Sequence, residues 1–354
     1  MKKLFAVLLA VMMLAGFSGC SSEGGARSSA APQQSSSQPA GEPEGGASSE
    51  TPAALEKITF VLDWTPNTNH TGVYVAKELG YYEEAGIEID IVQPPEDGAT
   101  ALVGTGKAEF GVDFQDYLAP ALLPDTAVPV TAVAAIIQHN TSGIVSLKEK
   151  GITSPKMLEG KTYATWELPV EQAIIKLVME RDGGDFSKLN MVPSTVTDVV
   201  SALQTNIDAV WIYYAWDGIA TKVKGLDTNY WEFRDIDPVL DFYTPVIVAN
   251  NDFLKNKPDV AKAFLAATAK GYEYAIEHPE EAAEILCNAD STLDKDIVLE
   301  SQKWLAGKYT EDASRWGEID ASRWDAFYAW LYEQNLIEQE IPAGTGFTND
   351  YLPE

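Results

Sequence analysis

Aromatic, amide and acidic side chains follow five apolar stretches of the sequence, and they could together hold a ligand. These side chains occupy residues 63–70, 114–116, 138–143, 166–171 and 211–217, none of which contains lysine or arginine. Indole and phenol rings stack on flat molecules, while carboxylates and carboxamides bond ring amines and nitrogens. Phosphate or sulfonate ligands call for arginine or helix amides instead. The pattern predicts a site for a flat, uncharged or weakly basic heterocycle.

The candidate ligand-binding residues come from all five stretches. They are Asp63, Trp64, Asn67, His70, Gln115, Asn140, Trp166, Glu171, Trp211, Tyr213, Trp216 and Asp217. Each type also has a structural alternative: a ring can cover a core, Asn67 can belong to a turn or cap, and Glu171 can lie in solvent in the first turn of a helix. The hypothesis therefore depends on the agreement of five segments and not on one residue.

Strands and helices alternate through most of the chain, and these elements must position the candidates. Apolar, β-rich runs predict strands at 57–64, 87–91, 108–112, 128–137, 161–166, 207–214 and 246–249. Periodicity and helix-start residues predict helices at 71–79, 99–106, 115–123, 170–181, 198–205, 217–224, 258–277, 279–287, 294–305 and 321–334. The strand–helix–strand unit at 57–92 is typical of a parallel sheet. Two such α/β blocks predict two lobes, with the ligand beyond the carboxyl ends of the strands.

The first 20 residues have the pattern of an export signal. Two lysines precede the apolar run Leu4–Phe17, and small residues follow it. The segment Phe17-Ser18-Gly19-Cys20 resembles the lipobox of bacterial lipoproteins, in which the cysteine takes a diacylglycerol; a plain secretory signal is the alternative. Residues 21–51 are rich in Ser, Gly, Ala and Pro and predict a flexible tether. We therefore expect a domain lipid-anchored through Cys20 at the outer face of the cytoplasmic membrane.

Composition excludes several classes of protein. The 354 residues include 25 Lys and Arg against 53 Asp and Glu, a net charge of −28 that argues against a nucleic-acid partner. Two cysteines exclude a disulfide framework. With Cys20 assigned to the lipid, Cys287 in a helical pattern is expected to be a buried, inert thiol. Three widely separated histidines give no multi-histidine metal centre.

Several motifs in fixed order resemble the NMT1/THI5-like proteins. The resemblance is carried by Leu62–Gly72 (LDWTPNTNHTG), Tyr74–Tyr82, Pro94–Ala99, Gly106–Gly111 and Gln138–Gly143. It covers roughly residues 57–254, and the helical tail matches only in pattern. It implies a type II periplasmic-binding-protein fold: two α/β lobes around a ligand cleft. The expected order is a signal at 1–20, a tether at 21–55, lobe I at 56–144, lobe II at 145–244, and a return to lobe I with helices at 245–354.

The resemblance also implies a function and roles for some residues. Bacterial members feed ABC importers, so an ABC permease and its ATPase are the expected partners of a monomeric binding protein without a cofactor or metal. Relatives bind thiamine-precursor pyrimidines such as hydroxymethylpyrimidine or formylaminopyrimidine, and some take riboflavin. A stacking tyrosine would fall on Tyr213, or on Tyr214. Asp217 would bond the exocyclic amine, with Asp63 or Asn67 contacting the ligand from the other lobe. The hinge crossings are expected near Ser142–Leu147 and Phe242–Val248.

The same role with riboflavin or another flat heterocycle as cargo is an open alternative, and two other functions are open as well. Fungal pyrimidine synthases share the fold, carry pyridoxal phosphate and consume a histidine that matches His70. They have a cysteine cluster where this chain reads Pro238–Tyr243 without cysteine, and they are cytoplasmic, which argues against an enzyme here. A lipoprotein sensor without transport is the other alternative. In a binding protein no bond is made or broken, and the ligand would stabilise the closed state by contacting both lobes.

Overall fold

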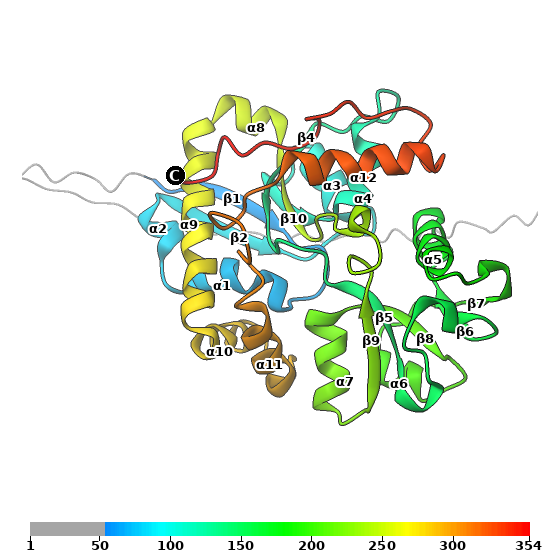
Figure 1. Cartoon of the computed structure of the whole chain (residues 1–354). Coiled ribbons are helices and arrows are strands. Elements are labelled where there is room, and N and C mark those ends of the chain that lie inside the picture. Colours follow the sequence, from blue (N-terminus) through cyan, green and yellow to red (C-terminus); the bar gives the residue numbers. More distant parts are fainter. Residues whose placement is uncertain (1–53) are drawn as a thin grey trace, which may run out of the picture. The chain divides into compact units, whose positions relative to one another are not determined.

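The computed structural model describes residues 54–354, so the predicted signal, Cys20 and nearly all of the tether lie outside the described residues. Within this range the strands form two five-stranded sheets, with helices packed on both (Figure 1). No helix in the described range is both long and apolar enough to span a membrane.

Sheet 1 contains the first four strands and the last. They are β1 (Glu56–Val61), β2 (Ile87–Val92), β3 (Phe110–Asp113), β4 (Val130–Ala135) and β10 (Val246–Asn250), in the order β2-β1-β3-β10-β4. Strands β1, β2 and β3 are parallel, whereas β10 is antiparallel to both β3 and β4. The expected parallel sheet is therefore mixed. Strand β10 returns from the other sheet without a helical crossover, and a parallel neighbour would need one.

Sheet 2 repeats this plan with the five middle strands. They are β5 (Ser142–Leu147), β6 (Thr162–Thr165), β7 (Asn190–Pro193), β8 (Ala209–Tyr213) and β9 (Thr228–Glu232), in the order β7-β6-β8-β5-β9. Here β5, which arrives from sheet 1, is the strand antiparallel to its neighbours β8 and β9. Strands β5, β7 and β9 were not predicted.

Two links join the sheets, residues 136–141 and residues 233–245. The first runs from the carboxyl end of β4 to the start of β5, and the second from the carboxyl end of β9 to the start of β10. Both links therefore leave the carboxyl-end edge of one sheet and reach the corresponding edge of the other. Across these edges Phe114, after β3, lies beside Tyr213, at the end of β8. The first link ends where the predicted crossing begins, since Ser142–Leu147 forms β5.

Helices cover the sheets. They are α1 (Thr71–Glu78), α2 (Tyr81–Glu84), α3 (Gly98–Gly104), α4 (Gln115–Leu122), α5 (Pro169–Arg181), α6 (Val199–Leu203), α7 (Ile219–Val223), α8 (Asn251–Asn256), α9 (Pro258–Glu277), α10 (Pro279–Ala289), α11 (Lys295–Leu305) and α12 (Ala321–Glu333). Alternate residues of sheet 1 pack into two cores: Phe60 and Phe110 with α1 and α9, and Val61 with α3, α4 and α12. Each predicted helix is present within a few residues of its expected ends.

The close crossing of α1 and α9 fixes the segment that leads into α1. A Cβ on Gly271 would lie 2.0 Å from the carbonyl oxygen of Gly72, and a Cβ on Gly72 would lie 2.3 Å from the Tyr272 ring. Only glycine at both positions lets the backbones approach this closely. The Tyr272 hydroxyl also donates to the Asn69 carbonyl at 2.6 Å. Helix α9 thereby holds the turn that carries several candidate residues.

Candidate functional site

The turn after β1 is built around His70, which is completely buried. Its Nδ1 lies 3.2 Å from the backbone N–H of Asn67 and so accepts that hydrogen bond. The ring proton is therefore on Nε2, which donates to Asp63 Oδ1 at 2.6 Å. Both ring nitrogens are used within the chain, so His70 orients the Asp63 carboxylate and offers no free nitrogen to a ligand.

The other candidates of this turn differ in their surroundings. The Asn67 side chain accepts from the N–H of Asn69 and donates to the Thr65 carbonyl, so it caps the short 3₁₀ helix Thr68–His70. Trp64 is 59% exposed, an unusual state for an indole. The structure thus presents Trp64 and Asp63 at this edge, and uses Asn67 and His70 to hold them.

Two carboxylates lie at the end of β3 and just after it. Asp113 accepts hydrogen bonds from the backbone N–H groups of Phe114, at 2.8 Å, and Thr100, at 3.2 Å, and from the Thr100 hydroxyl. Asp116, in the first turn of α4, has a different environment, because its Oδ1 is buried with no hydrogen-bond partner. Burial, with the nearby charge of Asp113 added, raises the pKa of Asp116 to about 7. Asp116 can therefore exist as an acid or as a carboxylate near neutral pH.

Aromatic rings from both sheets meet beside Asp116. Phe114 of sheet 1 and Tyr213 of sheet 2 lie nearly parallel, with ring centroids 6.0 Å apart and an interplanar angle of 12°. Tyr117 stands edge-on to Phe114 at 5.6 Å and is 48% exposed. Burial and the charge of Asp116 raise the pKa of Tyr213 well above its usual range. The Thr244 hydroxyl opposes this shift from beside the ring, although it does not reach full hydrogen-bond geometry.

Tyr213 and Tyr214, the two alternatives for the tyrosine that stacks on a ligand, have different surroundings. Tyr213 ends the strand and faces Phe114, whereas Tyr214 packs on Tyr230 at 4.7 Å and Trp304 at 5.1 Å. Residues Tyr214–Gly218 form a π-helix. Trp216, in this π-helix, packs against the cluster of Ala283, Leu286, Cys287 and Val298.

Asp217 lies in the same π-helix and is half-buried. Burial, with the charge of Asp198 added, raises its pKa to about 6. Desolvation by burial is the largest cause of this shift. A partly accessible carboxylate with a raised pKa stays a candidate for ligand binding.

Two further candidates, Gln115 and Asn140, have their polar atoms satisfied inside the chain. Gln115 donates to the Trp324 carbonyl and accepts from the Tyr243 N–H, both at 2.8 Å. Asn140 donates to the Leu240 carbonyl and accepts from the Ser142 N–H, also at 2.8 Å. These amides join the links and the C-terminal helices to the sheets. They therefore stabilise the frame around the facing edges.

Glu171 is buried in the same way. It accepts from the Tyr163 hydroxyl at 2.6 Å, the Thr165 hydroxyl at 2.9 Å and the Trp166 N–H at 3.1 Å. Trp211 is buried, with its ring 4.3 Å from that of Phe233, and Trp166 lies 5.6 Å from Trp211. Glu171 thus fixes the end of β6, and the two indoles extend from the core of sheet 2 toward that end.

Four site residues, Asp113, Phe114, Asp116 and Tyr117, are not among the twelve candidates. Phe114 and Asp116 lie in the predicted stretch 114–116, of which only Gln115 is a candidate. The available signal was Asp113-Phe-Gln-Asp116-Tyr117, two carboxylates and two rings directly after a strand. Sequence alone does not say which of these side chains turns inward, and the structure turns Gln115 into the core.

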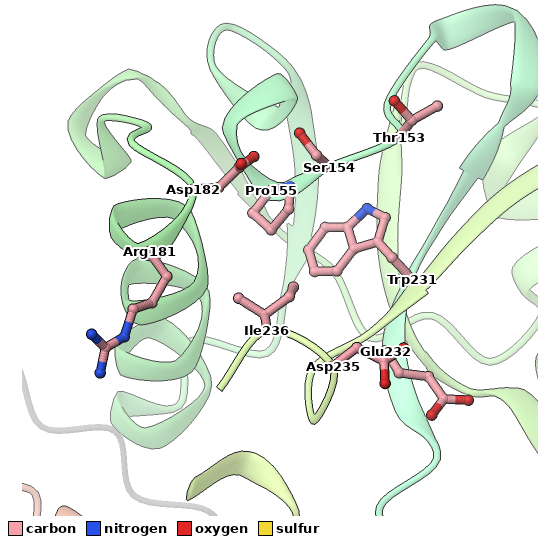
Figure 2. A pocket seen from close by; sticks show the side chains of 9 residues that line it. All are labelled: Thr153, Ser154, Pro155, Arg181, Asp182, Trp231, Glu232, Asp235 and Ile236. Carbon is pink, nitrogen blue, oxygen red and sulfur yellow. The ribbon is translucent and has the colours of Figure 1, made fainter. Parts of the chain in front are cut away.

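A pocket of about 360 Å³ lies elsewhere, against the edge strand β9 (Figure 2). Figure 2 shows the Trp231 indole facing Pro155 and Ile236, with Asp182 on the far side of Pro155. None of the candidate residues lines this pocket. In residues 54–354 no group of three or more His, Cys, Asp and Glu side chains is arranged to hold a metal ion. Cys287 is buried and free. The candidate site is therefore the group Asp63, Asp113, Phe114, Asp116, Tyr117 and Tyr213.

Most of the chain is similar to known proteins. Residues 67–282 match the family described as NMT1/THI5 like. The formylaminopyrimidine-binding protein of Halalkalibacterium halodurans is 30% identical over 304 residues, 84% of this chain and 91% of that protein. The 4-amino-5-hydroxymethyl-2-methylpyrimidine phosphate synthase of Legionella pneumophila is 25% identical over 319 residues, 84% of this chain and 93% of that protein.

Solved structures confirm the predicted fold class. The alkanesulfonate-binding protein SsuA from Xanthomonas axonopodis pv. citri, bound to MOPS, matches with a TM-score of 0.62 at 12% identity. The match covers 84% of this chain and 99% of that one. The two sheets joined by two links are those of a type II periplasmic-binding-protein fold. At this identity the likeness concerns the fold alone.

Proposed function

The chain belongs to the NMT1/THI5-like family, and from this premise we propose that it is the substrate-binding protein of an ABC-type importer for a thiamine-precursor pyrimidine. The cargo is of the formylaminopyrimidine or hydroxymethylpyrimidine type. The similarity to a formylaminopyrimidine-binding protein extends over nearly the whole folded region and supports this choice. The protein captures its ligand outside the cytoplasmic membrane, anchored through Cys20, and delivers it as a monomer to the permease.

The observation that carries the proposal is the Asp116 carboxyl beside the rings of Phe114 and Tyr213. An aminopyrimidine presents an amine donor next to a ring-nitrogen acceptor. A carboxylic acid matches this edge, since one oxygen accepts from the amine while its O–H donates to the ring nitrogen. With a pKa of about 7, Asp116 can take this form, or pair as a carboxylate with a protonated ring. The buried Oδ1, which lacks a donor in the chain, gains one.

The remaining contacts come from both sheets. The pyrimidine ring stacks on Tyr213, whose own neighbour across the gap is Phe114. Asp63, oriented by His70, and Asp217 are second acceptors for amine or hydroxymethyl groups. Trp64, exposed in the free protein, covers the bound ring. A ligand that contacts residues of both sheets stabilises the closed arrangement, because only there are all contacts made.

Binding is favoured over synthase chemistry by the state of His70. In the synthases that the chain resembles, the matching histidine is consumed in the reaction. Here His70 is completely buried, and both nitrogens have partners in the chain. A histidine used to orient Asp63 does not present itself to a reacting group. Mass spectrometry after incubation with pyridoxal phosphate and iron is expected to find His70 intact.

Isothermal titration calorimetry tests the proposal with formylaminopyrimidine, hydroxymethylpyrimidine, thiamine and riboflavin. The two pyrimidines are expected to bind, and Asp116→Leu to weaken them at least about tenfold, because the variant loses both hydrogen bonds of the carboxyl group, each worth roughly 1.5–3 kcal/mol when charged. Asp90→Leu, on the exposed side of β2, is the matched control and is expected to bind normally. Tight binding of riboflavin alone would reassign the cargo. The absence of binding across the panel would refute the pyrimidine proposal.

A further inference from the structure

We propose that Ser301, on α11, is a positioning residue that holds the ligand-contacting segments of the two sheets in one arrangement. The inference rests on the proposed function, since it concerns the site described above. Ser301 is more than 200 residues from the turn after β1 and 86 residues from the π-helix after β8. Its side chain is nevertheless hydrogen-bonded to both.

The hydrogen bonds form a directed chain through a completely buried hydroxyl. Ser301 Oγ donates to the carbonyl oxygen of Ala215. Thr68 Oγ1 lies 2.6 Å from Ser301 Oγ. Because the single proton of Ser301 goes to the carbonyl, the Thr68 hydroxyl must donate to Ser301. The Ser301 side chain thereby joins Thr68, in the turn after β1 of sheet 1, to Ala215, in the π-helix after β8 of sheet 2. This connection is separate from the two links.

The two residues it joins are placed beside the ligand contacts. Thr68 lies between Asp63 and His70, whose mutual hydrogen bond orients the Asp63 carboxylate. Ala215 lies between Tyr213 and Asp217, the stacking and acidic candidates of sheet 2. A shift of either segment changes the distance between the groups that grip the ligand from opposite sides.

Both segments are local structures that need outside support. The 3₁₀ helix at Thr68–His70 is three residues long, and Tyr214–Gly218 is a single π-turn. Such turns have weak hydrogen-bond geometry and do not persist on local interactions alone. On the sheet 1 side, the Tyr309 hydroxyl also donates to the Thr68 carbonyl at 2.7 Å. On the sheet 2 side, Lys224 just after α7 pairs with Asp294 just before α11. Helix α11 therefore touches both segments, and Ser301 is its direct contact.

The test measures hydrogen exchange and ligand affinity on the full chain. Ser301→Ala removes the bridge, and Thr68→Val removes only its first bond while keeping the side-chain shape. Both are expected to accelerate amide exchange across 68–71 and 214–218 and to weaken pyrimidine binding about tenfold. Thr68→Ser keeps the hydroxyl and is expected to restore both readouts. Ser314→Ala, which loses an exposed hydroxyl bond to Glu318, is the control and is expected to change neither.

The outcomes separate this inference from the proposed function. If the wild-type chain binds no pyrimidine, the proposed function fails, while the exchange data still decide whether Ser301 couples the two segments. If Ser301 had only a structural role, Ser301→Ala would lower the resistance to denaturant and leave the Kd of the folded protein for the pyrimidine unchanged. Unchanged Kd in both variants, or faster exchange in only one of the two segments, would overturn the inference. If Ser301→Ala does not fold, Thr68→Val and Thr68→Ser decide.

Discussion

Asp63 and Asp116 carry the same functional group but meet different neighbours. Asp63 receives a hydrogen bond from His70, whereas Asp116 Oδ1 receives none. Burial destabilises the charged form of Asp116, and this desolvation outweighs the backbone hydrogen bonds from Asp116 and Tyr117 that oppose it. At the scale of residues, a binding protein is recognised by such unpaired groups, because a ligand supplies what the fold leaves out.

This difference predicts how Asp116 affects stability. Burial raises its pKa from 3.8 to about 7, so the folded state binds the proton more tightly than the unfolded state does. Stability therefore falls as pH rises from about 4 to about 7. Asp116→Asn has no proton to lose and is expected to exceed the wild type at pH 8 by up to ~4 kcal/mol, with little difference at pH 4.

Urea denaturation of the ligand-free proteins at both pH values measures this effect. Asp90→Asn, on an exposed strand position, is the control and is expected to match the wild type at both. A gain of stability on removing the charge would show that the fold does not need the Asp116 carboxylate, as expected of a residue kept for binding. Lower stability of Asp116→Asn at pH 8 would instead assign the carboxylate a structural role.

At the scale of elements, helix contacts decide where the turn after β1 lies. The crossing of α1 and α9 leaves no room for a Cβ on Gly271, which would lie 2.0 Å from a backbone oxygen of Gly72. Backbone atoms cannot rotate away as a side chain does, so the helices themselves would have to separate. Since α1 begins at Thr71, such a shift reaches His70 and through it Asp63.

Gly271→Ala is accordingly expected to lower the free energy of unfolding by roughly 1–3 kcal/mol, the usual cost of overpacking. It is also expected to weaken ligand binding. Gly307→Ala provides the matched control, because nothing lies within 4 Å of the added methyl group and its φ is not positive. Equal stability of the two variants in urea denaturation would contradict the close packing of α1 against α9.

At the scale of the whole molecule, the two links are held together by His139. Its Nδ1 lies 2.6 Å from Asp241 in the second link, and its Nε2 lies 2.8 Å from Asp312 in the segment between α11 and α12. Two carboxylates can both be satisfied only when both nitrogens carry protons. The hydrogen bond to Asp241 is the main reason that the pKa of His139 is raised, and the nearby Arg323 opposes it.

The contribution of His139 to stability therefore depends on pH. The folded state binds the proton of His139 more tightly, so its stabilising effect is complete below the ordinary histidine pKa of about 6.5 and is lost as pH rises through the raised value. His139→Gln is expected to cost roughly 1.5–3 kcal/mol at pH 5.5, the range for hydrogen bonds to charged groups, and less at pH 9. His278→Gln, exposed on the surface, is the control in the same denaturation series. An equal cost at both pH values would show that the charge of His139 is not involved.

Much of the fold could be predicted from local pattern. The seven predicted strands and the ten predicted helices correspond to elements of the structure, because the apolar period and the helix-start residues act over a few neighbouring positions. Strands β5, β7 and β9 were not predicted. All four residues of β7 are exposed and only the ladder on β6 supports this strand, while β5 begins with Ser-Gly, which is not typical of a strand.

By itself the sequence determined that aromatic, amide and acidic side chains follow the strands, that lysine and arginine are missing there, and to which family the motifs belong. Only the tertiary structure decided which of those side chains are free. Gln115 is satisfied by Trp324, which lies 209 positions away, and Thr68 is held by Ser301, 233 positions away. A hydrogen-bonding group is available to a ligand only if no partner in the chain reaches it, and such partners come from segments that folding alone brings together.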